Sequence, residues 1–276
     1  RQQDRLVGCG GAVAQALIDN EGLPAGRVEV IYNGVDLAAL SSPAAGAGES
    51  IRREFSLSSE DFVVLQVARL HELKDHQTAL RAIDRARTSC PQIRLVIVGD
   101  GEKRTEIERT IRERRLEQHV RLAGTRSDIA SLLAAADVCL LSSISEGIPL
   151  TIIEAMAARL PVVATAVGGI PEMIEHGVTG YLARAGDEDS LANHLLQLHR
   201  NPLLREKMGQ TSERKAQQQF SLDGMIQQYR EVYREMLGEQ PRRLRLPAVG
   251  TTSGSGTSNC SHAERATAAD LSGACQ

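Results

Sequence analysis

Short β-rich runs alternate with helical stretches from about residue 61 to residue 200, and this alternation limits the folds that the chain can adopt. The helical stretches repeat their apolar residues at helical spacing, as Ala79, Leu80, Ile83 and Ala86 do. Strands that alternate with helices predict an α/β fold in which helices cover both faces of a parallel sheet. The expected strands are Phe62–Val67, Arg94–Val98, Val120–Leu122, Val138–Leu141 and Pro161–Ala164. The expected helices are His76–Ser89, Lys103–Arg115, Ser127–Ala135, Pro149–Ala158, a short helix after Gly168–Gly169, and Asp187–Arg200.

The segments that flank this region have a different composition. A Ser-, Ala- and Gly-containing linker is expected at residues 41–60. Residues 239–276 are Arg-rich and then rich in Thr, Ser and Gly, so a disordered tail is expected there. The other expected elements are a strand-turn-helix unit around Leu6–Ile18, a strand at Val28–Ile31, the turn Asn33–Gly34 and a last amphipathic helix at Phe220–Leu237.

Composition narrows the classes of function. The net charge of −3 argues against a general nucleic-acid binder, and the absence of Trp weakens a base-stacking role. No run reaches about 18 apolar residues and no signal peptide is visible, so no transmembrane helix is expected. The five cysteines lack a C-x-x-C pair and the histidines are scattered, so no metal site is expected, and the cytosol is the natural compartment.

Polar or glycine-containing loops follow the expected strands, at the edge where parallel sheets bind ligands. Arg69 directly follows the first strand and Lys74 precedes the next helix, so these two cations could clamp a pyrophosphate. A solvated pair of surface cations is the simpler interpretation. Gly99 begins a Gly-x-Gly turn that resembles a dinucleotide fingerprint, but Arg104 stands at the third glycine position. A Rossmann dehydrogenase is therefore not favoured, and a tight turn is the alternative.

A third loop contains Gly124, Thr125 and Arg126 directly after a short strand. Its backbone groups could receive a base. A helix cap supplied by Asp128 or Ser127 is the simpler interpretation of the same residues.

A fourth loop places Glu146 and Glu154 eight residues apart around Pro149, which suits the first position of a helix. The free N–H groups at a helix start, with the positive end of the helix dipole, favour an anion. An anion site flanked by two carboxylates suits a molecule that is part phosphate and part polyol, such as a nucleotide-sugar. Two exposed acids beside a core helix are the simpler interpretation. A glycosidase pair is another, but it leaves Arg69 and Lys74 without a role.

Five segments carry a combined pattern of higher specificity. They are VIYNGVD (residues 30–36), VARLHELKD (67–75), VIVGDG (96–101), SSISEGIPLTIIEAMAARLPVVATAVGGIP (142–171) and EHGVTGYL (175–182). Together they resemble family 4 of the retaining glycosyltransferases, over roughly residues 5–237. The resemblance implies a GT-B fold, in which two Rossmann-like domains face each other across a cleft. It assigns residues 1–40 to the end of the N-terminal acceptor domain and the interdomain junction, 61–219 to the C-terminal nucleotide-sugar-binding domain, and 220–238 to a helix that packs back on the first domain.

The resemblance also implies roles for individual residues. Arg69 and Lys74 match the cations that bind the donor diphosphate, and Glu146 matches the acid that contacts donor-sugar hydroxyls, so these three are the expected catalytic residues. Glu154 matches the acid that holds the ribose hydroxyls. Fixed cations and a helix dipole would neutralise the leaving group, so no metal or other cofactor is expected. The other expected donor-binding residues are Gly99, Gly124, Thr125, Arg126, Gly147, Ile148, Pro149, Leu150 and Thr151.

The chain departs from the family pattern in two ways. Only the donor half is recognised, and the turn Gly8–Gly11, which could also be read as a phosphate loop, stands where the family has a serine-containing turn. Arg159 replaces the glycine that usually ends the helix carrying Glu154. A left-handed arginine at that helix end would cost roughly 1–2 kcal/mol.

The sequence therefore predicts the donor-binding part of a retaining, metal-independent glycosyltransferase that needs a missing N-terminal domain. It would transfer a sugar from a nucleoside-diphosphate sugar, with a UDP-sugar as the expected donor, to a hydroxyl of a glycan or lipid-linked acceptor. The expected location is the cytoplasm, with peripheral contact to the inner face of the membrane as an option. The alternatives are a non-catalytic nucleotide-sugar-binding fragment and a nucleotide-sugar epimerase of the same fold.

Overall fold

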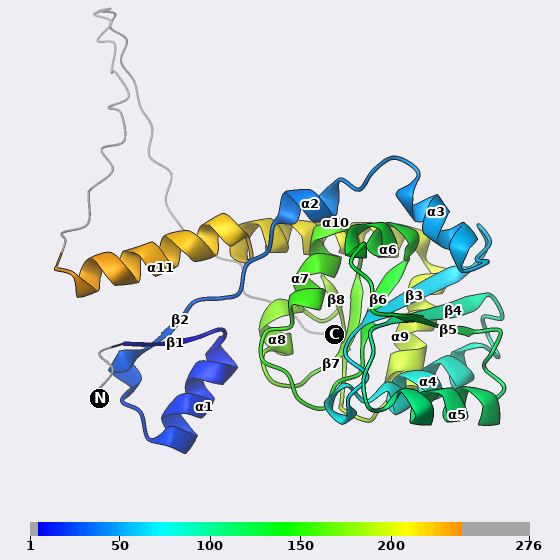
Figure 1. The fold of residues 1–276 in the computed structure, drawn as a ribbon, viewed down its shortest axis with the longest axis horizontal. Coiled ribbons are helices and arrows are strands. Elements are labelled where there is room, and N and C mark those ends of the chain that lie inside the picture. The colour runs from blue at the N-terminus through cyan, green and yellow to red at the C-terminus, as the bar shows by residue number, and fades with distance from the viewer. Residues whose placement is uncertain (1–4, 239–276) are drawn as a thin grey trace, which may run out of the picture. The chain divides into compact units, whose positions relative to one another are not determined.

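Six parallel strands form the central sheet of the protein in a computed structural model that describes residues 5–238 (Figure 1). The expected tail beyond these residues lies outside the described part of the chain. The strand order is β5-β4-β3-β6-β7-β8, which confirms the parallel sheet expected from the alternating pattern. The strands are β3 (Phe62–Val67), β4 (Ile93–Val98), β5 (Val120–Gly124), β6 (Val138–Leu141), β7 (Val162–Thr165) and β8 (Gly180–Ala183).

Helices cover both faces of this sheet because successive strand residues point to opposite sides. In β3, for example, Val64 is buried in one apolar cluster and Val63 in the other. The first cluster includes residues of α4 (His76–Ala86), α5 (Arg104–Glu113) and α9 (Glu188–Arg200). The second includes residues of α6 (Ile129–Ala135), α7 (Leu150–Ala157) and α8 (Ile170–Met173).

The edge strand β8 was not among the expected strands. It is only four residues long and begins with Gly180, which weakens the sequence signal for a strand. A Cβ atom at Gly180 would lie 2.2 Å from the carbonyl oxygen of Val162 in β7. The glycine therefore allows the two strands to approach closely, and it hides the strand from sequence analysis for the same reason.

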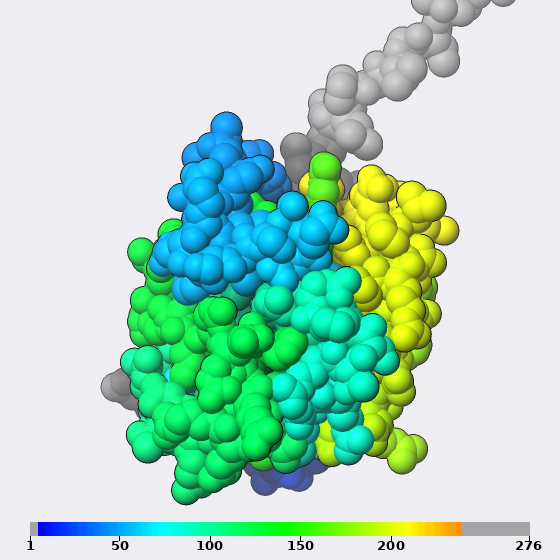
Figure 2. Space-filling view, turned by 90° about the vertical axis from the view of Figure 1, so that its right-hand side faces the viewer, coloured from blue at the N-terminus to red at the C-terminus, as the bar shows by residue number. Residues whose placement is uncertain are grey.

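The segment expected to be a linker, residues 41–60, contains a helix. It holds α3 (Ala47–Glu54), and α2 (Leu37–Ser41) precedes it. Ile51 of α3 is buried, and a Cβ atom at Gly48 would lie 2.6 Å from the carbonyl oxygen of Ala134 in α6. The small residues that predicted a linker thus serve close packing, and Figure 2 shows this segment in blue lying on the surface of the domain.

Two consecutive helices, α10 (Pro202–Gln219) and α11 (Leu222–Met236), end the described part of the chain. The last one confirms the expected amphipathic helix, but α10 was missed. Its start carries a recognisable signal, because Asn201 accepts a hydrogen bond from the N–H of Leu204 and Pro202 occupies the first turn. No helix within residues 5–238 is long and apolar enough to cross a membrane.

A separate βαβ segment precedes the sheet domain, as expected from residues 6–31. It consists of β1 (Leu6–Gly8), α1 (Gly11–Glu21) and β2 (Val28–Val30), and the two strands pair in parallel. The chain then crosses the break between α10 and α11, where the N–H of Val35 donates to Phe220 O at 3.1 Å and the N–H of Leu222 donates to Val35 O at 3.0 Å. A Cβ atom at Gly34 would lie 2.4 Å from Ser221 O, so this crossing requires the glycine.

Candidate functional site

The loops that follow β3 and β6 bring Lys74 and Glu146 together at the carboxyl edge of the sheet. Lys74 Nζ lies 2.6 Å from Glu146 Oε1, and Ser143 Oγ donates to the same oxygen at 2.6 Å. The Glu146 side chain is only 8% exposed and that of Lys74 is 26% exposed. Within residues 5–238, Glu146 Oε2 accepts no hydrogen bond. The carboxylate is therefore held through one oxygen, and the other remains available to a ligand hydroxyl.

Buried hydrogen bonds fix these two loops against each other. Ser142 Oγ lies 3.0 Å from Lys74 O and 2.9 Å from Asp75 O, and Gln66 Nε2 donates to Ser142 Oγ at 3.1 Å. Ser142 and Gln66 are fully buried. The backbone that carries Lys74 is thus tied directly to the strand end that carries Glu146. Sequence analysis named neither Ser142 nor Ser143, although two serines directly after a buried strand were a usable signal.

Arg69 lies near Lys74 in the sequence, but its side chain is much more exposed. Its side chain is 70% exposed, and Arg69 Nη2 lies 3.4 Å from Glu102 Oε2. Arg69 and Lys74 thus differ in exposure, and their expected joint role in binding a diphosphate stays a prediction. Gly99 has a φ of 140°, and a Cβ atom there would lie 2.1 Å from Ala68 O. The glycine is thus required where the loop after β4 packs on the loop after β3, and its part in donor binding stays a prediction.

The start of α7 differs slightly from the expectation. Pro149 is the N-cap residue, with φ −71° and ψ 122°, and Leu150 is the first helical residue. Within the described residues, the N–H groups of Gly147, Ile148, Leu150 and Thr151 donate no hydrogen bond. These groups and the positive end of the helix dipole are available to an anion, as the sequence predicted.

A glycine turn supports the loop before α7. The N–H of Gly169 donates to Gly147 O at 3.1 Å. A Cβ atom at Gly168, which has a φ of 53°, would lie 1.7 Å from Glu146 O. The turn after β7 therefore fixes the position of the Glu146–Gly147 backbone.

Glu154 is the fifth residue of α7, and this place inside the helix was expected. Burial raises the pKa of the Glu154 carboxyl. Burial also raises the pKa of the Cys139 thiol to about 12, and the nearby Glu154 charge adds to this increase. The described residues offer no hydrogen-bond donor to the Glu154 carboxylate. A half-buried carboxylate of this kind favours a ligand that brings hydroxyl donors.

In the loop after β5, the Arg126 side chain is bound by two carboxylates of the protein. Arg126 Nε and Nη2 donate to the two oxygens of Asp128 at 2.8 and 2.7 Å, and Arg126 Nη1 pairs with Glu54. The hydrogen bonds that Arg126 donates to Asp128 and then to Glu54 raise the pKa of Arg126. Asp128 is the N-cap residue of α6, as the simpler interpretation expected, but its carboxylate makes no capping hydrogen bond. The guanidinium of Arg126 is therefore occupied, and base binding by the backbone groups of Gly124, Thr125 and Arg126 stays a prediction.

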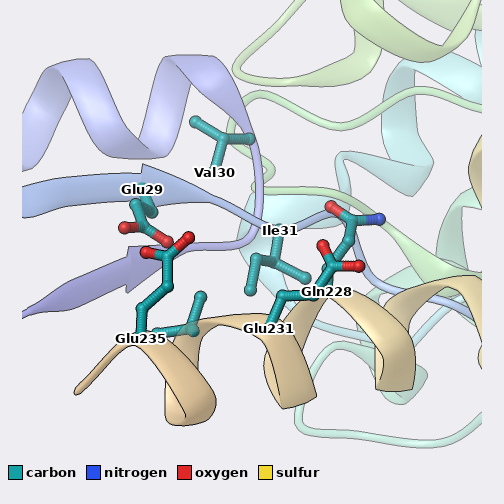
Figure 3. A pocket seen from close by; sticks show the side chains of 7 residues that line it. Glu29, Val30, Ile31, Gln228, Glu231 and Glu235 are labelled. Atoms are coloured by element: carbon teal, nitrogen blue, oxygen red, sulfur yellow. The ribbon is translucent and has the colours of Figure 1, made fainter. Parts of the chain in front are cut away.

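A groove of about 320 Å³ lies away from these residues, between β2 and α11 (Figure 3). Its lining shares no residue with the expected donor site, and Glu29, Glu231 and Glu235 give it an acidic character. Arg5 pairs with Glu29 and with Glu235. Carboxylates repel phosphate, so this groove does not suit a nucleotide. Within residues 5–238, the groove included, no three His, Cys, Asp or Glu side chains gather in a way that could hold a metal ion.

Known proteins match this chain over the same region. Residues 48–215 match the family model described as Glycosyl transferases group 1. The N-acetyl-alpha-D-glucosaminyl L-malate synthase of Bacillus anthracis is 31% identical over 187 residues, which cover 68% of this chain and 49% of that protein. A UDP-Gal:alpha-D-GlcNAc-diphosphoundecaprenol alpha-1,3-galactosyltransferase of Escherichia coli is 29% identical over 216 residues, which cover 76% of this chain and 55% of that protein. The chain thus spans about half the length of the curated relatives it matches.

Solved structures also match the fold. The Anabaena protein HepE in complex with UDP-glucose superposes with a TM-score of 0.80 at 29% identity, over 85% of this chain and 65% of that chain. HepE in complex with UDP gives a TM-score of 0.79 at 28% identity, over 84% and 64% of the two chains. The Rossmann-like half of a GT-B fold, expected from the sequence, is confirmed.

Proposed function

This chain belongs to the glycosyl transferases group 1, and we propose that it is the donor-binding part of a retaining glycosyltransferase that uses a UDP-sugar. One observation carries the proposal. Lys74 and Ser143 hold a single oxygen of Glu146 beside a helix start whose N–H groups are free, and Glu154 lies in that helix without a donor. A cation, an anion-binding helix start and two carboxylates fit a diphosphate that is linked to polyols at both ends.

Each residue has a separate task in the proposed reaction. The bond between the anomeric carbon and the diphosphate oxygen breaks, and its electron pair leaves with UDP. Lys74 and Arg69 stabilise the negative charge that develops there, each through charge-assisted hydrogen bonds of roughly 1.5–3 kcal/mol. The free N–H groups at the start of α7 act on the same charge. The acceptor hydroxyl oxygen forms the new bond to the anomeric carbon on the face that the diphosphate leaves, and its proton passes to the departing diphosphate.

The two carboxylates orient the donor. Glu146 Oε2 accepts a hydrogen bond from a donor-sugar hydroxyl, since Oε1 is already occupied by Lys74 and Ser143. Glu154 accepts from the ribose hydroxyls, which replace the water that its burial removes. We propose that protein charges and the helix dipole stabilise the departing diphosphate without a metal ion.

We propose that the acceptor binds to a further domain outside the sequence described here. The E. coli relative is named for a diphosphoundecaprenol-linked acceptor, which supports a lipid-linked glycan for this chain as well. We place the reaction in the cytoplasm or at the inner face of the membrane, with a further N-terminal domain that binds the acceptor. A nucleotide-sugar-binding module without catalysis is the second candidate, because this chain spans only half of its relatives.

Calorimetric titration of the chain with UDP-glucose, UDP and GDP-mannose tests the donor proposal. We expect UDP ligands to bind, and Lys74→Ala to weaken UDP binding by about 10–100-fold, the equivalent of one charge-assisted hydrogen bond. Glu231→Gln in the acidic groove is the matched control and leaves binding unchanged. Unaltered UDP affinity in Lys74→Ala contradicts the assignment. Turnover of bound UDP-sugar only in the presence of an acceptor distinguishes transfer from epimerisation and from binding alone.

A further inference from the structure

Glu172, a residue of α8 for which the proposed reaction has no task, reaches out of the sheet domain to the first turn of α1. Its carboxylate accepts hydrogen bonds from the N–H of Gly11 at 2.7 Å, from the N–H of Ala12 at 2.7 Å and from Tyr32 Oη at 2.7 Å. These partners lie 140 to 161 residues away in the sequence. The contact therefore joins the βαβ segment to the sheet domain.

The start of α1 is built to receive this carboxylate. Its N-cap residue is Gly10, which has no side chain to satisfy the first N–H groups of the helix. A Cβ atom at Gly11 would lie 3.2 Å from Glu172 Oε2, so the glycine leaves room for the acid. The turn Gly8–Gly11, which could have been read as a phosphate loop, thus holds an anion supplied by the protein itself.

The electrostatics of the contact agree with this geometry. Burial alone would raise the pKa of Glu172, but the hydrogen bonds from Ala12, Tyr32 and Gly11 outweigh it and lower the pKa. The hydrogen bond to Glu172, with burial, raises the pKa of Tyr32 to about 12. Lys215 Nζ donates to the backbone oxygen of Glu172 at 3.0 Å and not to its carboxylate. The carboxylate is therefore committed to the βαβ segment.

The same segment touches the loop that carries the proposed donor groups. A Cβ atom at Gly10 would lie 2.7 Å from the Ile148 side chain, and one at Gly147 would lie 3.6 Å from Cys9 Sγ. Asn33 Nδ2 donates to Ile148 O at 3.2 Å. The Gly147–Ile148 backbone is thus enclosed between the start of α1 and the glycine turn that precedes Glu172.

We propose that Glu172 is a positioning residue for donor binding: by holding the start of α1, it presses the βαβ segment against Gly147 and Ile148 and fixes their N–H groups. We call the Glu172 carboxylate with Gly11 N, Ala12 N and Tyr32 Oη the Glu172 clamp. This inference rests on the proposed function, because the role of Gly147 and Ile148 in holding a UDP-sugar is part of that proposal.

The test compares the Glu172→Gln and Glu175→Gln variants of this protein with the wild type. Glu175 is exposed, lies in the loop that follows α8 and makes no side-chain hydrogen bond in residues 5–238, so it is a matched control. Three readouts are needed: amide hydrogen exchange at Gly11 and Ala12, the titration of Tyr32 followed by NMR of labelled tyrosine, and calorimetry with UDP and UDP-glucose. The last readout is one that a merely structural contact would not move.

We expect Glu172→Gln to speed exchange at both amides, to lower the pKa of Tyr32 from about 12 towards 10, and to weaken UDP-glucose binding about tenfold. Glu175→Gln should change none of the three. Unchanged exchange in Glu172→Gln would mean that no clamp exists. Faster exchange with a UDP-glucose affinity equal to that of the wild type would make the contact purely structural, and either result overturns the inference. Failure of the proposed function has a different signature, because the wild-type chain would then bind neither ligand.

Discussion

Replacing Arg159 tests how much backbone strain the helix that carries Glu154 contains. Arg159 has a φ of 59°, in the left-handed region that was expected from its place in the sequence. The strain has no easy relief, because a Cβ atom at Gly209 of α10 would lie 1.9 Å from Arg159 O. That close approach fixes the peptide at the end of α7. The side chain adds one interaction, since Arg159 Nε lies 2.7 Å from Glu213 Oε2.

Two substitutions separate the strain from the ion pair. Arg159→Ala removes the ion pair and keeps a Cβ atom, whereas Arg159→Gly removes both. The difference between them isolates the backbone, which we expect to favour glycine by about 1 kcal/mol, after roughly 1–2 kcal/mol of strain relief is offset by 0.4–1 kcal/mol of added unfolded-state entropy. The ion pair itself contributes little to stability, because 66% of the Arg159 side chain is exposed and solvent screens the charge.

Urea denaturation followed by circular dichroism measures this difference. We expect Arg159→Gly to unfold at a higher midpoint than Arg159→Ala, with a melting temperature about 2–4 °C higher, and both variants to keep the wild-type m-value. Equal midpoints, or a higher one for alanine, would refute the argument that the left-handed residue is strained. UDP affinity should be the same in both variants, because the change lies at the far end of α7 from the free N–H groups.

Three further outcomes follow from the site. Gly168→Ala should abolish UDP binding in a chain that still folds, because its Cβ atom would lie 1.7 Å from Glu146 O; calorimetry and circular dichroism check this together. Ser143→Ala should weaken UDP-glucose binding about tenfold and leave UDP binding unchanged, because it frees the carboxylate proposed to hold the sugar; equal losses for both ligands would contradict that role. The low folded-state pKa of Glu172 should stabilise the chain fully above its unfolded value near 4.5, with this contribution lost as the pH falls through the folded value; urea midpoints of Glu172→Gln measured against pH should lack that loss.

The sequence predicted the elements whose signals are local. The apolar face of α4 was confirmed because Ala79, Leu80, Ile83 and Ala86 are all buried. The meeting of Lys74 and Glu146 also follows from a local rule, since polar residues after neighbouring parallel strands gather at one edge of the sheet. The left-handed backbone of Arg159 could be predicted because helix ends have a small set of conformations.

The features that were missed depend on contacts between distant segments. Gly48 lies in the expected linker and Gly180 in a strand that was not expected, but each allows another backbone to approach closely. The role of Ser142 depends on the loop after β3, because its hydroxyl contacts the backbone oxygens of Lys74 and Asp75. Glu172 could not be assigned from sequence, because the helix start that it holds lies about 160 residues earlier. The pairing of Arg126 with Glu54 could not be predicted, because it depends on α3, a helix that was not foreseen.

The crossing of the chain at Val35 and Phe220 has a mechanical consequence. The βαβ segment is joined to the sheet domain by residues 33–36, and the chain returns to it through α11, which borders β2. Both connections pass the same point and are tied there by two backbone hydrogen bonds, with Gly34 in contact with Ser221. Two tethers that meet at one point form a pivot, which permits rotation but resists sliding.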